Sequence, residues 1–388
     1  MSQTQTEEFS CPYYQRGDCR SCSLLPKGFA EALSWKNSRF LDRIEKAGVE
    51  SSKVLDLMAL DSPANSRGRV KLSVSETDNE PVIGLLNNSF SGIDLSSCPL
   101  HFEELNKLVQ AIPSLLKKFE VTPYKVKSRE GELKGVILGS NSARDSVYLR
   151  FVVRSKVQEK ALRSVAKSLQ ETFKFLRVVS MNIQPIPHQV LEGPEEMVFT
   201  KDEEIEERLS GISLYLHPQA FFQATPEIAE KLYLQASEFA VGFENALDLY
   251  CGVGGFSLFL ADKVQKVKGV ERSPKSIVCA KKSAEKNKIA NCEFVCSDVE
   301  DWQQGLSIDG FDLVLVNPPR RGVDAQTISA ICAGAVKRLI YSSCNLETLL
   351  RDIELLQSDF QLVNIQPFDM FPLTEHLEVL AILDRKRQ

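Results

Sequence analysis

The second half of the chain alternates short apolar strands with single helices, and this pattern constrains the fold more than any other sequence feature. Strands are predicted at 246–250, 266–271, 292–296 and 311–316, with helices between them at 256–262 and 275–287. Strands separated by one helix pair in parallel through right-handed crossovers. Two apolar strands without an intervening helix follow at 360–365 and 378–383. We therefore expect an α/β domain over residues 211–388, with a Rossmann-like parallel sheet that ends in an antiparallel hairpin.

The residues before this domain divide into two parts. Residues 1–26 contain three cysteines and no apolar periodicity, which is typical of a ligand-bearing loop rather than a helix or strand. Residues 27–210 predict an α+β domain. Its expected helices lie at 29–47, 105–119 and 156–175, and its expected strands at 69–74, 82–86, 135–138 and 148–153.

Charge is unevenly distributed along the chain. With 47 Lys and Arg against 52 Asp and Glu, the whole chain does not have the composition of a nucleic-acid binder, because phosphate contacts require basic side chains. Between Lys107 and Val178, however, 16 basic side chains stand against 6 acidic ones. A charge run of this kind usually indicates only a solvated face. The alternative, which we take as the expectation for this central region, is a surface that faces RNA.

The N-terminal residues and the cysteine content indicate where the chain acts. Residues 1–10 lack the basic and apolar blocks of a signal peptide, and no apolar run is long enough to span a bilayer. We therefore expect a cytoplasmic protein, and a monomer with no obligate protein partner. In a cytosolic chain, ten cysteines indicate metal ligands, a nucleophile and buried thiols rather than disulfides.

A glycine-rich turn follows the first strand of the α/β domain. Gly252 and Gly254 let the backbone approach a ligand closely at the start of a helix. The dinucleotide pattern G-x-G-x-x-G fails because Ser257 stands at its last position, which disfavours an NAD-dependent oxidoreductase. Glu271 ends the second strand, where an acid binds ribose hydroxyls, and Asp298 follows the third strand on the expected adenine side. A generic nucleotide binder of the doubly wound class is the alternative.

Two further segments end at the same predicted edge of the sheet. Asn317-Pro318-Pro319-Arg320 follows the fourth strand, and Ser343-Cys344-Asn345 follows a strand at 339–342. The carboxyl edge of an open α/β sheet is where such folds bind their ligands. A lone cysteine is most often a buried structural thiol, so Cys344 becomes a candidate nucleophile only in combination with its neighbours.

These motifs resemble those of the RNA uracil-C5 methyltransferases, a class I S-adenosylmethionine-dependent family. The resemblance covers nearly the whole chain and includes Val316–Gly322, Tyr341–Asn345, His376–Leu380, Cys11–Tyr13, Gly17–Cys22, Phe221–Gln223, Asn182–Pro185 and Phe368–Pro372. It implies that Cys344 is the nucleophile that adds to C6 of a uracil and that Glu378 is the base that removes the C5 proton. A surface carboxylate at a strand start is the alternative for Glu378. His376 and Arg320 are expected near the uracil oxygens.

The same resemblance assigns the cofactor contacts and the substrate. It implies that Gln223, Tyr250, Glu271 and Asn317 contact S-adenosylmethionine, and that the substrate is a uridine of 23S ribosomal RNA. Two alternatives stay open, namely the same chemistry on a uridine of transfer RNA or elsewhere in 23S RNA, and a non-catalytic RNA-binding module. Two stretches depart from the family pattern: 66–69 reads Ser-Arg-Gly-Arg for Phe-Arg-Asn-Lys, and Thr225 replaces an Asn.

The N-terminal cysteines have metal-ligand spacing. Cys11, Cys19 and Cys22 form a C-x7-C-x2-C pattern, and Cys98 in a distant loop is the expected fourth ligand. Four thiolates suit zinc or a [4Fe–4S] cluster. The family resemblance implies the [4Fe–4S] cluster, with a structural role that pins the N-terminal loop to the RNA-facing domain.

Overall fold

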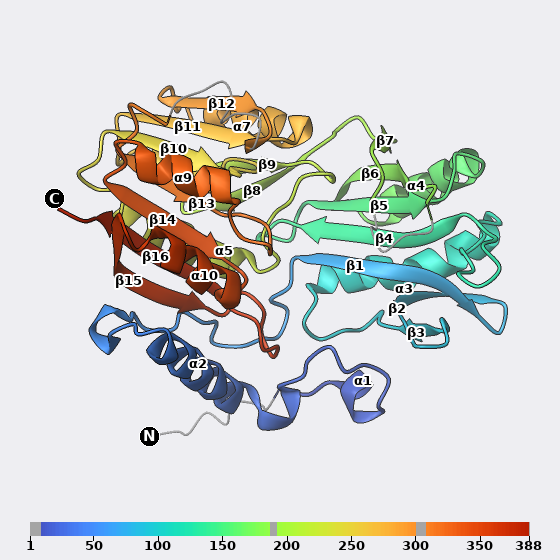
Figure 1. The fold of residues 1–388 in the computed structure, drawn as a ribbon. Helices are drawn as coiled ribbons and strands as arrows, with labels where there is room; N and C mark the ends of the chain where they lie inside the picture. The colour runs from blue at the N-terminus through green and yellow to red at the C-terminus, as the bar shows by residue number, and fades with distance from the viewer. Residues whose placement is uncertain (1–8, 187–191, 300–307, 388) are drawn as a thin grey trace, which may run out of the picture.

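Two seven-stranded sheets lie side by side in the computed structural model, which describes residues 9–186, 192–299 and 308–387 (Figure 1). The central sheet has the order β3-β2-β1-β4-β5-β6-β7. Its strands are β1 (Arg69–Thr77), β2 (Glu80–Leu86), β3 (Gly92–Asp94), β4 (Leu133–Ser140), β5 (Val147–Val153), β6 (Leu176–Ile183) and β7 (Glu195–Val198). A short hairpin of β8 (Ile205–Leu209) and β9 (Ile212–Leu216) leads to the C-terminal sheet.

The C-terminal sheet confirms the predicted parallel winding. Its order is β12-β11-β10-β13-β14-β16-β15, and the first five strands are parallel. Its strands are β10 (Asn245–Leu249), β11 (Lys266–Glu271), β12 (Cys292–Cys296), β13 (Leu313–Val316), β14 (Arg338–Ser343), β15 (Phe360–Phe368) and β16 (Glu378–Arg385). The expected final hairpin is present, and its second strand, β16, inserts between β14 and β15, antiparallel to both.

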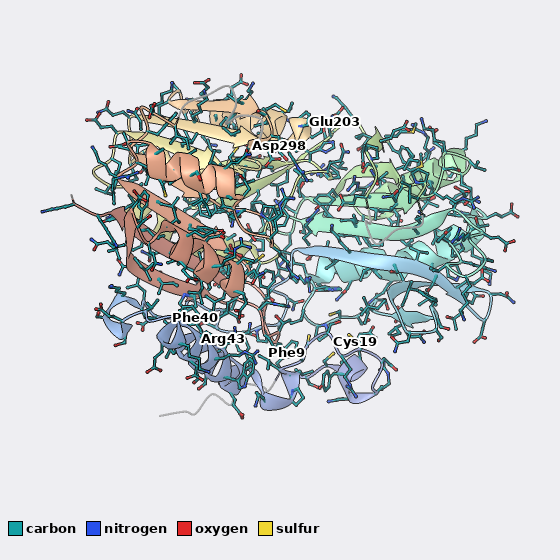
Figure 2. All side chains as sticks on the ribbon, viewed as in Figure 1. Phe9, Cys19, Phe40, Arg43, Glu203 and Asp298 are labelled. Atoms are coloured by element: carbon teal, nitrogen blue, oxygen red, sulfur yellow. The ribbon has the colours of Figure 1, made fainter. Side chains whose placement is uncertain are left out.

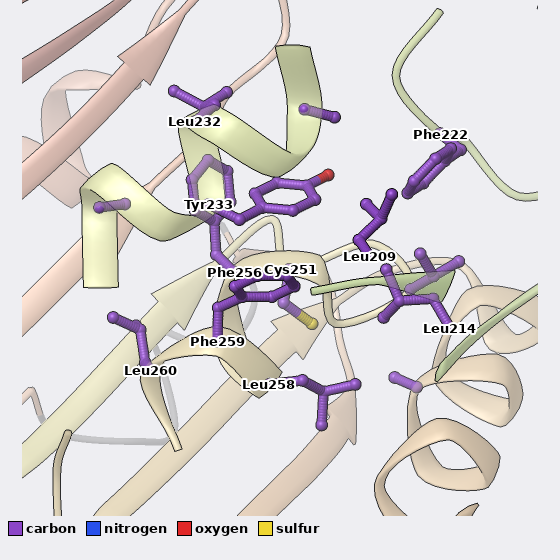
Figure 3. Packing of buried hydrophobic residues seen from close by; sticks show 14 of the residues in the cluster. Leu209, Leu214, Phe222, Leu232, Tyr233, Cys251, Phe256, Leu258, Phe259 and Leu260 are labelled. Carbon is purple, nitrogen blue, oxygen red and sulfur yellow. The ribbon is translucent and has the colours of Figure 1, made fainter. Parts of the chain in front are cut away.

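Alternate residues of the buried strands face two different helix layers. Leu313 and Leu315 of β13 pack with α5 (Pro226–Glu238), α6 (Gly255–Leu260) and α7 (Pro274–Lys286). Val314 and Val316 pack on the other face, with α9 (Ala325–Ala333) and α10 (Leu346–Leu356). A strand with apolar side chains on both faces is expected where helices cover both sides of a parallel sheet. The layer under α5 and α6 is aromatic, with Tyr233 edge-on to Phe256 (Figure 3).

The central sheet is covered by helices on one face. Helices α3 (Glu103–Lys118) and α4 (Glu159–Thr172) pack on one face of its sheet. The β1–β2 hairpin turns at Asp78 and Asn79, which both have positive φ (52° and 62°). Two such residues form the turn whose twist matches the strands of a hairpin. Strands β6 to β9 and helices α9 and α10 were not anticipated from the sequence.

The N-terminal helix packs with the C-terminal sheet, although its sequence position assigns it to the central domain. Helix α2 (Phe29–Lys46) contributes Phe40 and Ile44 to the core beneath β13 and β14. The chain after it continues along β15, where isolated bridges join Val54 to Ile365 and Met58 to Phe368. The apolar stripe of α2 therefore completes the C-terminal layer, and Figure 1 shows the helix beside β15 and β16.

The cysteine-rich segment is a loop with one added helical turn, α1 (Pro12–Gln15), and two 3₁₀ turns follow at Leu25–Lys27 and Ser51–Lys53. Among the described helices, none combines the length and the apolar composition that crossing a membrane requires.

Candidate active site

The carboxyl ends of β13 and β14 bring two predicted site segments together. The strands are parallel neighbours, with Val316 paired to Tyr341, so Asn317 and Cys344 emerge at the same edge. Asn345 begins α10, because its side chain accepts a hydrogen bond from the Glu347 backbone amide. The Asn345 amide also donates to the Arg320 carbonyl over 3.0 Å. The loop carrying Arg320 is thereby fastened to the loop carrying Cys344.

Glu378 reaches this edge from the opposite direction. It is the first residue of β16, which runs antiparallel to β14 and pairs Val379 with Ser343. Its carboxylate is buried, and Oε1 accepts hydrogen bonds from Ser342 Oγ over 2.6 Å and from Asn317 Nδ2 over 3.0 Å. Asn317 Nδ2 also donates to the Ser342 carbonyl over 3.0 Å. The predicted base is therefore fixed by the two strands that carry the other site residues.

Burial makes Glu378 a weak acid. Removal from water raises the pKa of its carboxyl to about 7, although the hydrogen bonds from Ser342 and Asn317 act to lower it. A carboxyl with a pKa near neutrality both accepts and releases a proton readily at physiological pH. The burial of the Glu378 side chain excludes the alternative that it is a surface carboxylate.

Cys344 lies within the electrostatic influence of that carboxylate. The thiol is half-buried, and burial, followed by the negative charge of Glu378, raises its pKa. Arg320 acts in the opposite direction, through its charge and a hydrogen bond to the thiol. A thiolate at this position therefore depends on Arg320, or on a substrate that consumes the thiolate as it forms.

A cleft of about 310 Å³ opens onto Cys344. Its walls are formed by the loops at the edge of the sheet and by helix α2, and the lining residues include Arg320, Cys344, Asn345, Glu375 and His376. Burial, followed by the positive charges of Arg320 and Lys36, lowers the pKa of His376. The imidazole is consequently neutral near pH 7 and acts there as a hydrogen-bonding group rather than as a charge.

A buried lysine holds the segment that leads into Glu378, and the sequence analysis missed it. Lys36 and Asp369 form an ion pair in which neither side chain is exposed. Lys36 Nζ also donates to the carbonyls of Phe371 and His376, each over 2.9 Å. The available signal was a lysine on the apolar stripe of α2, at i and i+4 spacing from Ala32 and Phe40.

The predicted cofactor loop has the backbone of a tight turn. Tyr250, Gly252 and Gly254 have φ values of 65°, 54° and 83°, and α6 begins immediately after them. A Cβ on Gly255 would lie 2.7 Å from the Tyr233 ring, so the helix start cannot carry a larger residue. Glu271 accepts hydrogen bonds from the amides of Gly252 and Ser273. Tyr250 and Glu271 therefore lie together at the open edge of the sheet.

The Phe221–Gln223 segment precedes α5. Phe222 packs in the core (Figure 3), Gln223 is buried, and Phe221 is 61% exposed. Thr225, where the family pattern has Asn, is buried and donates to the Met370 carbonyl over 2.9 Å. The Thr225 hydroxyl therefore helps to hold in place the segment that precedes Glu378.

The four predicted ligand cysteines converge from two loops. Burial raises the pKa of the Cys22 thiol to about 12, and the neighbouring thiols of Cys98, Cys11 and Cys19 add to the effect. Burial also raises the pKa of the Cys98 thiol, and the positive charge of Arg67 partly opposes the rise at Cys22 and at Cys98. In the described parts of the chain, no three side chains of His, Cys, Asp or Glu are arranged closely enough to hold a metal ion.

Acidic partners neutralise part of the basic central region. Lys117, Lys125 and Lys156 pair with Glu80, Glu76 and Glu195 respectively, all from outside the basic run. Arg150 is buried and pairs with Glu192 and Glu196. The surface between Lys107 and Val178 is thus less positive than the sequence count of that region suggests.

Comparison with known proteins identifies a family model and relatives that this chain matches. A family described as tRNA (Uracil-5-)-methyltransferase matches residues 194–386. A 23S rRNA (uracil(747)-C(5))-methyltransferase RlmC from Xenorhabdus nematophila is 36% identical over 96% of this chain and 99% of its own. The enzyme of the same description from Shewanella baltica is 34% identical over 96% of both chains.

A solved structure shares most of the fold. The tRNA (uracil-54, C5)-methyltransferase of Pyrococcus abyssi, in complex with S-adenosyl-L-homocysteine, matches with a TM-score of 0.77 and 25% identity. The match covers 94% of this chain and 85% of that one.

Proposed function

The chain belongs to the S-adenosylmethionine-dependent RNA uracil-C5 methyltransferases, and from that premise we propose that it methylates a uridine of 23S ribosomal RNA through a covalent bond to Cys344. The observation that carries the covalent mechanism is the placement of one thiol and one buried carboxyl at the same sheet edge. The negative charge of Glu378 acts on the pKa of Cys344. Cys344 lines the cleft, together with Leu377 and Val379 on either side of Glu378.

The chemistry of uracil requires two such groups. C5 of uracil is too weak a nucleophile to attack a methyl donor unaided, and addition of a thiolate at C6 raises its electron density. A proton must then leave C5 before the thiolate is eliminated and the ring is restored. Cys344 supplies the thiolate, and Glu378, with a pKa of about 7, takes the C5 proton.

The reaction proceeds through four bond changes, in which Cys344 and Glu378 take part in turn. The Cys344 thiolate forms a bond to C6, and the electron pair of the C5–C6 double bond moves onto C5 and the adjoining carbonyl. C5 then gains a methyl group, which S-adenosylmethionine would supply as its S–CH3 bond breaks and S-adenosylhomocysteine leaves. Glu378 takes the proton from C5, the double bond re-forms, and the Cys344 thiolate leaves. Arg320 and the neutral His376 face the same cleft, where they donate hydrogen bonds to the uracil oxygens.

We assign the cofactor contacts to four residues around the glycine turn. Glu271 binds the ribose hydroxyls, Tyr250 packs on the nucleoside, and Gln223 and Asn317 approach the amino-acid end. Asn317 also donates to Glu378, so it links the cofactor side of the site to the base. Support for this assignment comes from the open glycine turn beside Glu271 and from the burial of Gln223.

We further propose that Cys11, Cys19, Cys22 and Cys98 hold a [4Fe–4S] cluster. Support comes from the type of donor, because four thiols are the ligand set of such a cluster and those of Cys98, Cys11 and Cys19 each raise the pKa of Cys22. Such mutual repulsion is relieved when a metal centre takes the thiolates as ligands. The described side chains must move closer together to ligate a metal. Zinc, which four thiolates also suit, is the competing occupant.

The substrate is assigned from the relatives that match over nearly the full length. Those relatives are described as acting on uracil 747 of 23S rRNA, and we propose the same nucleotide for this chain. Because a cleft of about 310 Å³ admits a single nucleotide and not a duplex, the target base must leave its stack. With ribosomal RNA as the substrate, the place of action is the cytoplasm.

Methyl transfer to defined RNAs tests this assignment. Purified protein is incubated with methyl-labelled S-adenosylmethionine and a 23S RNA fragment that contains uridine 747. We expect one labelled 5-methyluridine per fragment, and no label when that uridine is replaced by cytidine. Label in transfer RNA instead, or at another 23S uridine, would overturn the substrate and leave the chemistry intact.

A further inference from the structure

Helix α2 forms one wall of the cleft that contains Cys344. The residues that it contributes are Trp35, Lys36, Arg39, Phe40 and Arg43. The opposite wall carries the nucleophile, together with Arg320 and His376. An RNA strand that delivers a base to Cys344 through this cleft therefore passes close to the exposed side of α2.

We propose that α2 is an RNA-binding surface that holds the strand beside the target uridine. Arg39 and Arg43 bind two neighbouring phosphates, and Trp35 stacks on a flanking base. This inference rests on the proposed function, because it assumes that Cys344 attacks a base of an RNA strand. The RNA contact closest to the target uridine is then made by the N-terminal helix α2, and not by the region between Lys107 and Val178.

The two arginines are exposed and available for exchange. Arg39 lies 3.6 Å from Glu375 with 49% of its side chain exposed, and Arg43 pairs with Glu347 with 38% exposed. Ion pairs at such exposure contribute little stability. A phosphate therefore displaces the carboxylate easily, and each phosphate bound by an arginine releases condensed counterions from the RNA. Figure 2 shows Arg43 on α2, below the C-terminal sheet.

The spacing along the helix suits a single strand. Arg39 and Arg43 are four residues apart, which places them on one face of α2 about 6 Å apart along its axis. That separation is comparable to the distance between adjacent phosphates of an extended strand. Trp35 precedes Arg39 by another turn, with the Arg39 guanidinium 5.0 Å from the ring centroid. The half-buried ring is thus oriented in advance for stacking on a base.

The helix is also held rigidly in place. The buried Lys36–Asp369 pair fixes it to the segment before Glu378, and Phe40 and Ile44 anchor it in the core. A surface that does not move on binding loses less free energy to ordering. The RNA-binding side chains of α2 are therefore held at a fixed position relative to the catalytic residues.

The salt dependence of RNA binding tests the proposal. In Arg39→Gln/Arg43→Gln, the slope of log K against log salt for a 23S fragment should fall by about 1.4, since each phosphate contact in a single strand contributes about 0.7. The KM for RNA should rise while the affinity for S-adenosylmethionine stays the same. The matched control is Lys46→Gln, an exposed lysine of the same helix that does not line the cleft, and its slope should equal that of the wild type.

Three further variants test the phosphate contacts and the stacking contact separately. Lys127→Gln/Arg129→Gln removes two charges from the basic central region. If this pair lowers the slope and the α2 pair does not, the strand lies on the central domain and the proposal is overturned. Trp35→Leu should weaken binding roughly tenfold through loss of stacking, whereas Trp35→Phe should retain it. Equal binding by both Trp35 variants would overturn the stacking contact.

Failure of this proposal is distinguishable from failure of the proposed function. At saturating RNA containing 5-fluorouridine at the target, the wild-type protein should form a conjugate that survives denaturant. If that conjugate forms and the α2 variants bind RNA as the wild type does, only the α2 proposal fails. If no conjugate forms with the wild-type protein, the proposed covalent function fails with it.

Discussion

The hydroxyl of Ser342 donates to Oε1 of Glu378 over 2.6 Å, across the antiparallel strands β14 and β16. This bond, with the one from Asn317, is what opposes the effect of burial on the carboxyl. The position of Glu378 and its acidity are therefore set by the same two residues.

The pH dependence of turnover should report that acidity. Glu378 acts as a base only when ionised, so kcat should rise with pH through a midpoint of about 7. In Ser342→Ala the carboxyl loses a donor that lowers its pKa, and the midpoint should move to higher pH. Methylation should then be several-fold slower at pH 7 and recover toward pH 9, whereas Ser342→Thr should retain the wild-type profile. An unchanged midpoint in Ser342→Ala would show that Glu378 does not limit the profile.

Glu378 should also lower the stability of the folded protein at neutral pH. Burial raises its pKa from 4.5 to about 7, so the folded state retains a proton that the unfolded state has lost between these values. Stability from this group is therefore present below pH 4.5 and is lost as pH rises to about 7, by roughly 3 kcal/mol. Compared with the wild type, Glu378→Gln should gain stability in urea unfolding at pH 8 relative to pH 5. A difference between the two proteins that does not vary with pH would contradict the raised pKa.

Lys36 should be required for stability and for the geometry of the site. Lys36→Met leaves Asp369 buried without its partner, which costs about 3–5 kcal/mol. Adding Asp369→Asn should recover part of that loss, because the unpaired charge is removed. The exposed Lys46→Met on the same helix should unfold like the wild type. Equal stability of Lys36→Met and Lys46→Met would exclude a role for the buried pair.

The N-terminal cysteines should hold iron. Protein purified without oxygen should contain about four iron atoms per chain and absorb visible light. Cys98→Ser should lose the iron, whereas Cys296→Ser, an exposed cysteine at the end of β12, should keep it. Stoichiometric zinc without iron would identify the competing metal, and full iron in Cys98→Ser would assign the fourth ligand to another residue.

The site residues that follow the parallel strands β13 and β14 were predictable from the sequence, because the alternation of strands and helices is visible in local stretches of the chain. Alternating strands and helices place Asn317 and Cys344 at one edge as soon as β13 and β14 are recognised as parallel neighbours. Glu378 was not predictable in this way. It comes from β16, whose insertion beside β14 depends on long-range pairing, and only the family resemblance identified it.

The N-terminal helix shows a second limit of local pattern. The amphipathic stripe of α2 predicted a helix that ends one residue beyond the observed one, but not the sheet on which it packs. The Lys36–Asp369 contact joins residues 333 positions apart, and no local signal encodes such a separation. For the same reason, no local signal indicated that α2 forms a wall of the cleft at Cys344, and the RNA contacts at Lys107–Val178 stay a prediction from charge density.

The fate of the covalent intermediate in two variants tests the account most directly. With Cys344→Ala no bond to C6 can form, so neither methylated RNA nor a protein–RNA conjugate should appear. With Glu378→Gln the thiolate still adds and the methyl group still transfers, but the C5 proton remains and elimination stalls. A conjugate that survives denaturant and carries the labelled methyl group should therefore accumulate only with Glu378→Gln. Full methylation by Cys344→Ala, or normal turnover by Glu378→Gln, would contradict the covalent mechanism.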